Sequence, residues 1–312
     1  MQANHTESLE LLNYTQYDIK NVISDLNKFG YAKLDNVIPH GICSSLSKTF
    51  DELRVLREQV SGKECSEATR EEKRFVEASG QVLLRDILFQ RPDVLLPFLN
   101  LPPVMEVVSE ILDDVVILDA HSASNSCYRD PLYRRSPTIH VDSPLAIRDI
   151  TQTTHIAAMI CVEDFTAGNG GTRIWPGSHK SGILVHKTPG YSENQIPGHV
   201  EIHANKGSIL FFLGQTWHQV GTNIDDSSRW AMIIFYTRWW VKPATDYTRC
   251  GEDLFNLCST EQKSLLGFAS KSPMNRMLRH QILINPDNIS PSYTEAARGD
   301  RMSPAHFDEA YR

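Results

Sequence analysis

The segment Thr138-Ile139-His140-Val141-Asp142-Ser143-Pro144 places a histidine and an aspartate two positions apart among β-branched residues. In an extended strand, side chains at this spacing point to the same face, so we predict that His140 and Asp142 lie side by side. One distant histidine would complete three ligands on one side of a metal ion and leave its other side open. Two histidines and one carboxylate with open positions suit non-haem Fe(II) that reacts with oxygen.

His218 is the third ligand in this hypothesis, because it follows a buried-strand pattern and a turn at Gly214. Three other His-x-Asp/Glu triplets begin at His5, His199 and His306. The first lies near the start of the chain, the second leaves little chain before the next histidines, and no histidine follows the last. Only His140-x-Asp142 combines a strand-like setting with a late histidine after ample intervening sequence.

Arg229 stands directly before the apolar run Trp230–Tyr236. A guanidinium that leads into such a strand is costly to bury unless an anion meets it. A carboxylate held through two parallel hydrogen bonds is the natural partner. The alternative is a structural ion pair with Asp225 or Asp226.

Composition excludes several classes of function. The net charge of −7 over 312 residues argues against a nucleic-acid partner, which needs clustered Lys and Arg. The start of the chain lacks the pattern of a secretory signal, and no apolar run is long enough to predict a membrane span. Six cysteines without a CxxC pair are expected to be reduced thiols, so we predict a cytoplasmic protein.

The apolar spacing predicts one α+β domain over residues 1–312, with a β-sandwich or small barrel at its centre. We expect a loose start, a mostly helical part, a strand-rich core, a helical part and a polar tail, at 1–15, 16–114, 115–240, 241–284 and 285–312 respectively. Within the second part, we predict a helix that starts at Gln16 and is closed by Phe29-Gly30, and helical spacing is also predicted through Val82-Leu83-Leu84. Within the core, Gly198 to Ala204 is one of the predicted strands.

Four elements of the chain together resemble the phytanoyl-CoA dioxygenase-like family. They are His140-x-Asp142, the segment Asn169-Gly-Gly-Thr-Arg-Ile-Trp-Pro-Gly-Ser-His-Lys180, the strand Gly207–Phe212 with His218, and Arg229. The resemblance covers residues from about 16 to 240 and implies Fe(II), 2-oxoglutarate and O₂ as cofactor and cosubstrates. It also implies a double-stranded β-helix (jelly-roll, cupin-like) core, with flanking helices mainly from the N-terminal part.

The resemblance assigns roles to individual residues. It makes His140, Asp142 and His218 the iron ligands, with no catalytic residue beyond the iron centre. Arg229 matches the arginine that holds the C5 carboxylate of 2-oxoglutarate, and Thr172 matches a threonine that contacts it. Several members carry Gln where this chain has Pro137, and Arg85 is a candidate for the missing role. His179 is expected to be a structural part of its loop.

By this resemblance, oxidative decarboxylation of 2-oxoglutarate to succinate and CO₂ drives hydroxylation, desaturation or a related C–H oxidation. The chain looks most like members that tailor natural products such as meroterpenoids and alkaloids, and Ser259–Gly267 adds to that likeness. Asp142 separates it from the related halogenases, which have a small residue there. The partners expected are a small-molecule substrate, no nucleic acid, no membrane, and a second copy in a homodimer that uses the C-terminal tail.

Two other classes of protein remain open: a non-catalytic metal- or ligand-binding β-barrel, and a zinc hydrolase with the same three ligands. Neither needs an arginine for a dicarboxylate. The substrate itself has no transferable sequence code, because pocket walls come from variable loops. Trp217, Tyr128 and Arg238 could face it, but each is better explained as a packing or surface residue.

Overall fold

The protein is described here by a computed structural model, which covers residues 9–64, 82–112, 116–126, 139–143, 153–192, 195–225 and 229–270. The described residues fall into two compact units. We call the one formed by Glu10–Leu84 and Ser122–Ile233 the sheet unit. The other, which contains Arg85–His121 and the chain from Ile234 onward, is the helical unit. The single domain over residues 1–312 stays a prediction.

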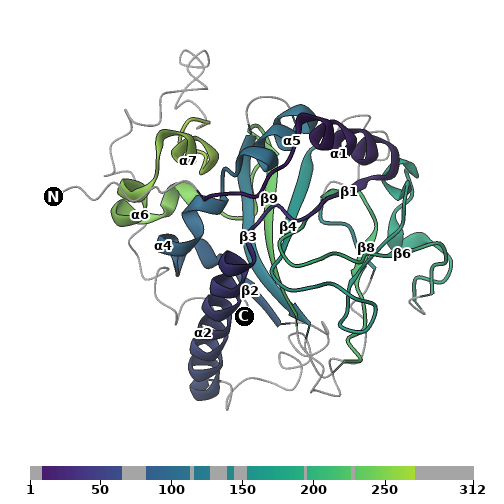
Figure 1. The fold of residues 1–312 in the computed structure, drawn as a ribbon, viewed down its shortest axis with the longest axis horizontal. Coiled ribbons are helices and arrows are strands. Elements are labelled where there is room, and N and C mark those ends of the chain that lie inside the picture. Colours follow the sequence, from purple (N-terminus) through teal and green to yellow (C-terminus); the bar gives the residue numbers. More distant parts are fainter. Residues whose placement is uncertain are drawn as a thin grey trace. The chain divides into compact units, whose positions relative to one another are not determined.

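The sheet unit holds most of the strands (Figure 1). Its elements are α1 (Gln16–Phe29), β1 (Tyr31–Leu34), α2 (His40–Glu64), β2 (Val82–Arg85), β4 (His155–Cys161), β5 (Thr172–Ile174), β6 (Val200–Glu201), β7 (Ile209–Leu213) and β8 (His218–Val220), with short 3₁₀ helices at Ser178–Lys180 and Val185–Lys187. Two long strands, β3 (Val116–Ser126) and β9 (Arg229–Arg238), run from one unit into the other.

Helix α1 shows how local sequence signals set an element. Thr15 caps its first turn and forms a reciprocal capping box with Asp18. The helix buries Ile19, Val22 and Leu26, and it ends at Gly30, whose φ of 85° suits glycine. The predicted helix from Gln16 to Phe29 is therefore confirmed.

The strands form two sheets, one of six strands in the order β1-β7-β4-β9-β3-β2 and one of three in the order β6-β5-β8. Strand β7, next to the edge strand β1, pairs antiparallel with β1, where Tyr31 lies opposite Phe212, and with β4, where Ile156 lies opposite Leu213. Every residue of β4 and β7 is buried, so both faces of these strands are covered. Helices beside antiparallel sheets confirm the predicted α+β class.

Two local predictions need correction. Val82–Arg85 is the strand β2, not part of a helix. A short apolar run cannot reveal its period, and pairing at the edge of the six-stranded sheet decides its conformation. The predicted strand from Gly198 to Ala204 is shorter than expected, because only Val200–Glu201 forms β6. Pro137, Tyr128 and the tail 285–312 lie outside the described residues.

The helical unit contains α4 (Pro92–Leu95), α5 (Pro102–Leu112), α6 (Gly251–Leu257) and α7 (Thr260–Leu265), with 3₁₀ helices at Ile87–Phe89, Leu96–Phe98 and Tyr247–Arg249. Polar side chains satisfy buried backbone carbonyls of this unit. The hydroxyl of Tyr236 donates to the carbonyl of Leu99, and Nη1 of Arg238 donates to the carbonyl of Leu112 at the end of α5. Arg238 thus has a structural role in the described fold. In the described ranges no helix alone has the length and apolar character to cross a membrane, and one bent pair, Pro92–Phe98 with Pro102–Leu112, meets that test only jointly.

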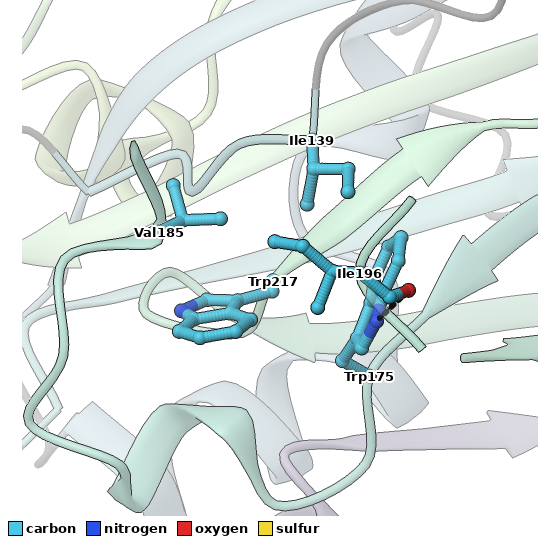
Figure 2. Close-up of a cluster of buried hydrophobic side chains, with 5 residues drawn as sticks. All are labelled: Ile139, Trp175, Val185, Ile196 and Trp217. Atoms are coloured by element: carbon cyan, nitrogen blue, oxygen red, sulfur yellow. Dashed lines mark hydrogen bonds between the residues drawn. The ribbon is translucent and has the colours of Figure 1, made fainter. Parts of the chain in front are cut away.

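A compact apolar cluster in the sheet unit supports the segment that carries two of the predicted ligands (Figure 2). This segment forms an isolated bridge at His140 and not the predicted strand. Its members are Ile139, Trp175, Val185, Ile196 and Trp217, with Val141 and Tyr191 packed against it. Trp175 also donates from Nε1 to the carbonyl of Ile196 at 3.1 Å. Ile139 and Val141 alternate with His140 and Asp142 along the chain, so the cluster anchors one face and leaves the other to the polar side chains. Trp217 is therefore a packing residue.

Candidate metal centre and cosubstrate site

The structure brings the three predicted metal ligands together in the sheet unit. Each of His140, Asp142 and His218 offers one ligand atom, and these atoms all lie within 4.8 Å of one another. Nε2 of His140 lies 3.7 Å from one carboxylate oxygen of Asp142, and Nε2 of His218 lies 3.4 Å from the other. No other group of three such residues converges in the described part of the chain.

Backbone pairing explains why two histidines so far apart in sequence meet. His140 and His218 exchange both backbone hydrogen bonds, each 3.0 Å long, as directly opposed residues of an antiparallel bridge. Their rings consequently lie on one face, with centroids 4.2 Å apart and ring planes tilted by 53°. On its other side His218 pairs with Ile174 of β5. The bridge thus adds His140 to the edge of the three-stranded sheet.

The environment of His218 prepares Nε2 to act as a ligand. Nδ1 lies 3.0 Å from the carbonyl oxygen of Thr216, which can only accept, so Nδ1 carries the proton of the neutral ring and donates it. Nε2 then presents its lone pair toward Asp142. The side chain of His218 is 7% exposed while that of His140 is 43% exposed. One side of the cluster is therefore closed and the other is open.

Asp142 supplies the observation that tests whether a metal ion fits. Its Oδ2 atom is buried and makes no hydrogen bond with any described residue. Burial raises the pKa of this carboxyl, but the imidazoles of His218 and His140 outweigh burial and leave its pKa below the ordinary value. Burial lowers the pKa of His218, and the Asp142 carboxylate more than restores it. A buried anionic oxygen without a donor, facing two imidazole nitrogens, fits a divalent metal ion.

Arg229 is buried, as its position before an apolar strand predicts, with 1% of its surface exposed. Its Nε donates to the carbonyl of Gly170 at 3.1 Å, Nη2 donates to the same oxygen, and Cζ lies 3.9 Å from the centroid of the Phe165 ring. Burial lowers the pKa of Arg229 to about 10, so it remains a cation at neutral pH.

The guanidinium of Arg229 forms no ion pair with another described residue. This excludes the structural pair with Asp225, while Asp226 lies outside the described residues. One edge of the guanidinium is thus fixed by backbone and ring. Of the described carboxylates only Glu163 acts on the pKa of Arg229, and it forms no ion pair with the guanidinium. Sequence reasoning did not find Phe165, which carries no pattern, although Gly170 belongs to the Asn-Gly-Gly-Thr motif that it did single out.

Three predicted residues remain: Thr172, His179 and Arg85. Thr172 opens β5, is 2% exposed and donates to the sulfur of Met159 at 3.8 Å. It stands two residues after the Gly170 carbonyl that holds Arg229. His179 is half-buried in the 3₁₀ helix Ser178–Lys180 and is not part of the metal cluster. Arg85 is the last residue of β2 and the one residue of that strand that belongs to the helical unit. Its role in place of the absent Gln stays a prediction.

Comparison with known proteins agrees with this geometry. A family model described as phytanoyl-CoA dioxygenase (PhyH) matches residues 26–231. The uncharacterized protein Rv1501 of Mycobacterium tuberculosis is 24% identical over 255 residues, which cover 80% of this chain and 87% of that protein.

Solved structures show the same fold. The non-haem α-ketoglutarate-dependent epimerase SnoN from nogalamycin biosynthesis is 16% identical, with a TM-score of 0.52 over 74% of this chain and 87% of its own. HygX from Streptomyces hygroscopicus, solved with nickel and 2-oxoglutarate bound, is 11% identical, with a TM-score of 0.55 over 74% of this chain and 90% of its own.

The structural likeness confirms the predicted double-stranded β-helix core with flanking helices. The matched family segment contains all three members of the metal cluster as well as Thr172 and Arg229. The family match and the structural likeness both agree with a metal ion at the buried Oδ2 of Asp142, which has no hydrogen bond from the described residues. This chain belongs to the phytanoyl-CoA dioxygenase family and is an enzyme of the oxygenase type that uses Fe(II), 2-oxoglutarate and O₂.

Proposed function

We propose that this enzyme oxidises a C–H bond of a small organic molecule, with conversion of 2-oxoglutarate to succinate and CO₂. His140, Asp142 and His218 would hold Fe(II), and Arg229 and Thr172 would hold the cosubstrate. The convergence of three ligand atoms within 4.8 Å, around a carboxylate oxygen that has no hydrogen bond, carries this proposal.

When bound, Fe(II) supplies the redox chemistry that links decarboxylation of 2-oxoglutarate to oxidation of the substrate. The chain contributes position and charge. The Thr216 carbonyl sets the tautomer of His218, and Asp142 contributes a negative charge that offsets the cation. Asp142 also fills the ligand position that is vacant in halogenases, which favours oxidation over halogenation.

Arg229 is suited to orient a dicarboxylate. Its Nε–Nη2 edge is occupied by the Gly170 carbonyl, so a carboxylate has to approach the other nitrogen, Nη1, or the outer hydrogen of Nη2. Phe165 covers one face of the guanidinium and prevents it from turning. A fixed cation at a set place along β9 would hold the far carboxylate of 2-oxoglutarate while its other end reaches the metal.

We infer a natural product as the substrate class. SnoN is named as an enzyme of nogalamycin biosynthesis, and HygX has been solved with hygromycin B bound, so the fold accommodates such molecules. The net charge of −7 favours a small molecule over nucleic acid. Hydroxylation, desaturation and epimerisation all begin at one C–H bond of the substrate, and product analysis separates them.

The decisive test is anaerobic addition of Fe(II) followed by 2-oxoglutarate, with visible absorption as the readout. We expect the weak charge-transfer band of an iron-chelated 2-keto acid, and its loss in His218→Ala. Metal binding without a band would contradict the cosubstrate assignment and favour a zinc hydrolase or a binding protein. Consumption of 2-oxoglutarate without any metal dependence would contradict the metal centre itself.

A further inference from the structure

The short segment that carries two of the three ligands is tied down at both ends. At one end His140 is bridged to His218 by two backbone hydrogen bonds. At the other end the N–H of Ser143 donates to the carbonyl of Gly214 at 2.9 Å. Asp142 lies between these two attachments, so the direction of its carboxylate depends on both.

A third buried histidine, His155 at the start of β4, lies at the second attachment. It is 3% exposed, and its Nδ1 lies 2.9 Å from the hydroxyl of Thr154 and 3.4 Å from the hydroxyl of Ser143. Its carbonyl accepts the N–H of Gly214 at 2.9 Å. His155 therefore contacts both partners of the bond that fixes the segment after Asp142.

The packing around Gly214 leaves no space for a larger residue. A Cβ added to Gly214 would lie 2.7 Å from Cβ of His155 and 3.1 Å from Cβ of Ser143. Three chain segments meet there, and only glycine fits between the other two side chains. Movement of the His155 ring would consequently be felt by Ser143, the residue next to the ligand.

We propose, on the basis of the metal centre proposed above, that His155 is a positioning residue that holds Ser143 and thereby aims the Asp142 carboxylate at the metal. A histidine that merely filled space would need no hydroxyl partners, whereas Nδ1 of this one has two hydroxyls within 3.4 Å. Partners of this kind around ligands usually matter for metal affinity.

The test uses Co(II) as the probe, because its visible absorption reports both affinity and ligand geometry. We expect His155→Phe, which keeps a ring but loses the polar contact, to weaken Co(II) binding about 10- to 100-fold and to alter the spectrum. His155→Asn, whose amide can take the place of Nδ1, should recover most of the affinity. His121→Phe, a change at an equally buried histidine of the helical unit, is the matched control and should leave Co(II) binding unchanged.

Each outcome has a distinct meaning. If the unaltered protein binds no Co(II), the metal centre proposed above fails. If it binds Co(II) but His155→Phe has the same affinity and spectrum, only the role of His155 fails. Ser143→Ala provides a second route should His155→Phe not fold, because it removes one hydroxyl and little volume. Unchanged Co(II) affinity in Ser143→Ala would then overturn the proposal.

Discussion

Two buried polar sites in this protein look alike at first and differ in what surrounds them. In the sheet unit, Oδ2 of Asp142 is buried without a hydrogen bond from the described residues. In the helical unit, both ring nitrogens of His121 are likewise buried without one. Two imidazole nitrogens lie 3.4 and 3.7 Å from the carboxylate oxygens of Asp142. No such group acts on His121, whose pKa is shifted by burial alone.

The difference shows what distinguishes a metal-binding carboxylate from a buried polar side chain that binds nothing and only lowers the stability of the fold. Burial lowers the pKa of His121 to about 3, so its ring is neutral and simply occupies the core. Asp142 keeps its charge despite burial, because the neighbouring imidazoles lower its pKa. An unpartnered polar atom by itself therefore indicates little, and it indicates a metal site only where several ligand atoms converge.

The largest effect is expected from removing a converging ligand. Asp142→Asn keeps the shape of the side chain but removes the charge, and it should lower 2-oxoglutarate turnover on the order of 10³-fold or more. The melting temperature without metal should fall modestly, because Oδ2 has no hydrogen bond to lose but the attraction between the carboxylate and the two imidazoles is removed. Succinate formation and thermal unfolding measure the two quantities. Substantial turnover in Asp142→Asn would show that convergence at this point is incidental.

Arg229 differs from Asp142 because its buried guanidinium already has hydrogen bonds to the Gly170 carbonyl and a contact with Phe165. Removing the guanidinium in Arg229→Ala should raise the 2-oxoglutarate concentration for half-maximal rate about 10- to 100-fold, the usual worth of a charged hydrogen bond. Arg173→Ala is the control, because Arg173 lies on β5 but pairs with Glu201 at the surface. An unchanged 2-oxoglutarate requirement in Arg229→Ala would remove Arg229 from its assigned role.

His121 should affect the pH dependence of the free energy of unfolding and not the rate of catalysis. Its pKa is about 3 in the folded state and about 6.5 when unfolded, so between these values the unfolded state binds the extra proton. Stability should be complete above pH 6.5 and fall by about 2 kcal/mol between pH 6.5 and pH 5. Urea unfolding at pH 7, 6 and 5 measures this. His121→Phe should flatten the profile, and an equally steep profile in that variant would exclude His121 as the cause.

Much of the metal site was predictable because its pattern is local. The alternation that puts His140 and Asp142 on one face needs only an extended segment, and the strand at His218 has a clear apolar and turn pattern before it. Arg229 was predictable for a similar reason, since its position before an apolar strand implied burial. The roles of these residues in metal and cosubstrate binding stay predictions until they are measured.

The rest depends on contacts that no short pattern records. Val82–Arg85 is a strand because of its neighbour in the sheet, and its four residues suit a helix equally well. The burial of His121 and His155 results from packing between distant segments, so neither histidine differs in sequence from a surface one. The acceptor of Arg229 is a backbone carbonyl, and any residue has one.

The smallest effect should come from Gly170, whose carbonyl fixes Arg229. Gly170 has φ of +80°, and a Cβ there would lie 2.7 Å from the carbonyl oxygen of Gly221. Gly170→Ala should therefore shift the acceptor and raise the 2-oxoglutarate requirement about fivefold, or about 1 kcal/mol. Gly177→Ala is the matched control, since Gly177 has φ of +78° but nothing within 4 Å of its added Cβ. If Gly170→Ala and Gly177→Ala raise the 2-oxoglutarate requirement equally, backbone strain and not the displaced carbonyl explains the effect. The charge of Arg229 would then matter more for cosubstrate binding than its fixed orientation.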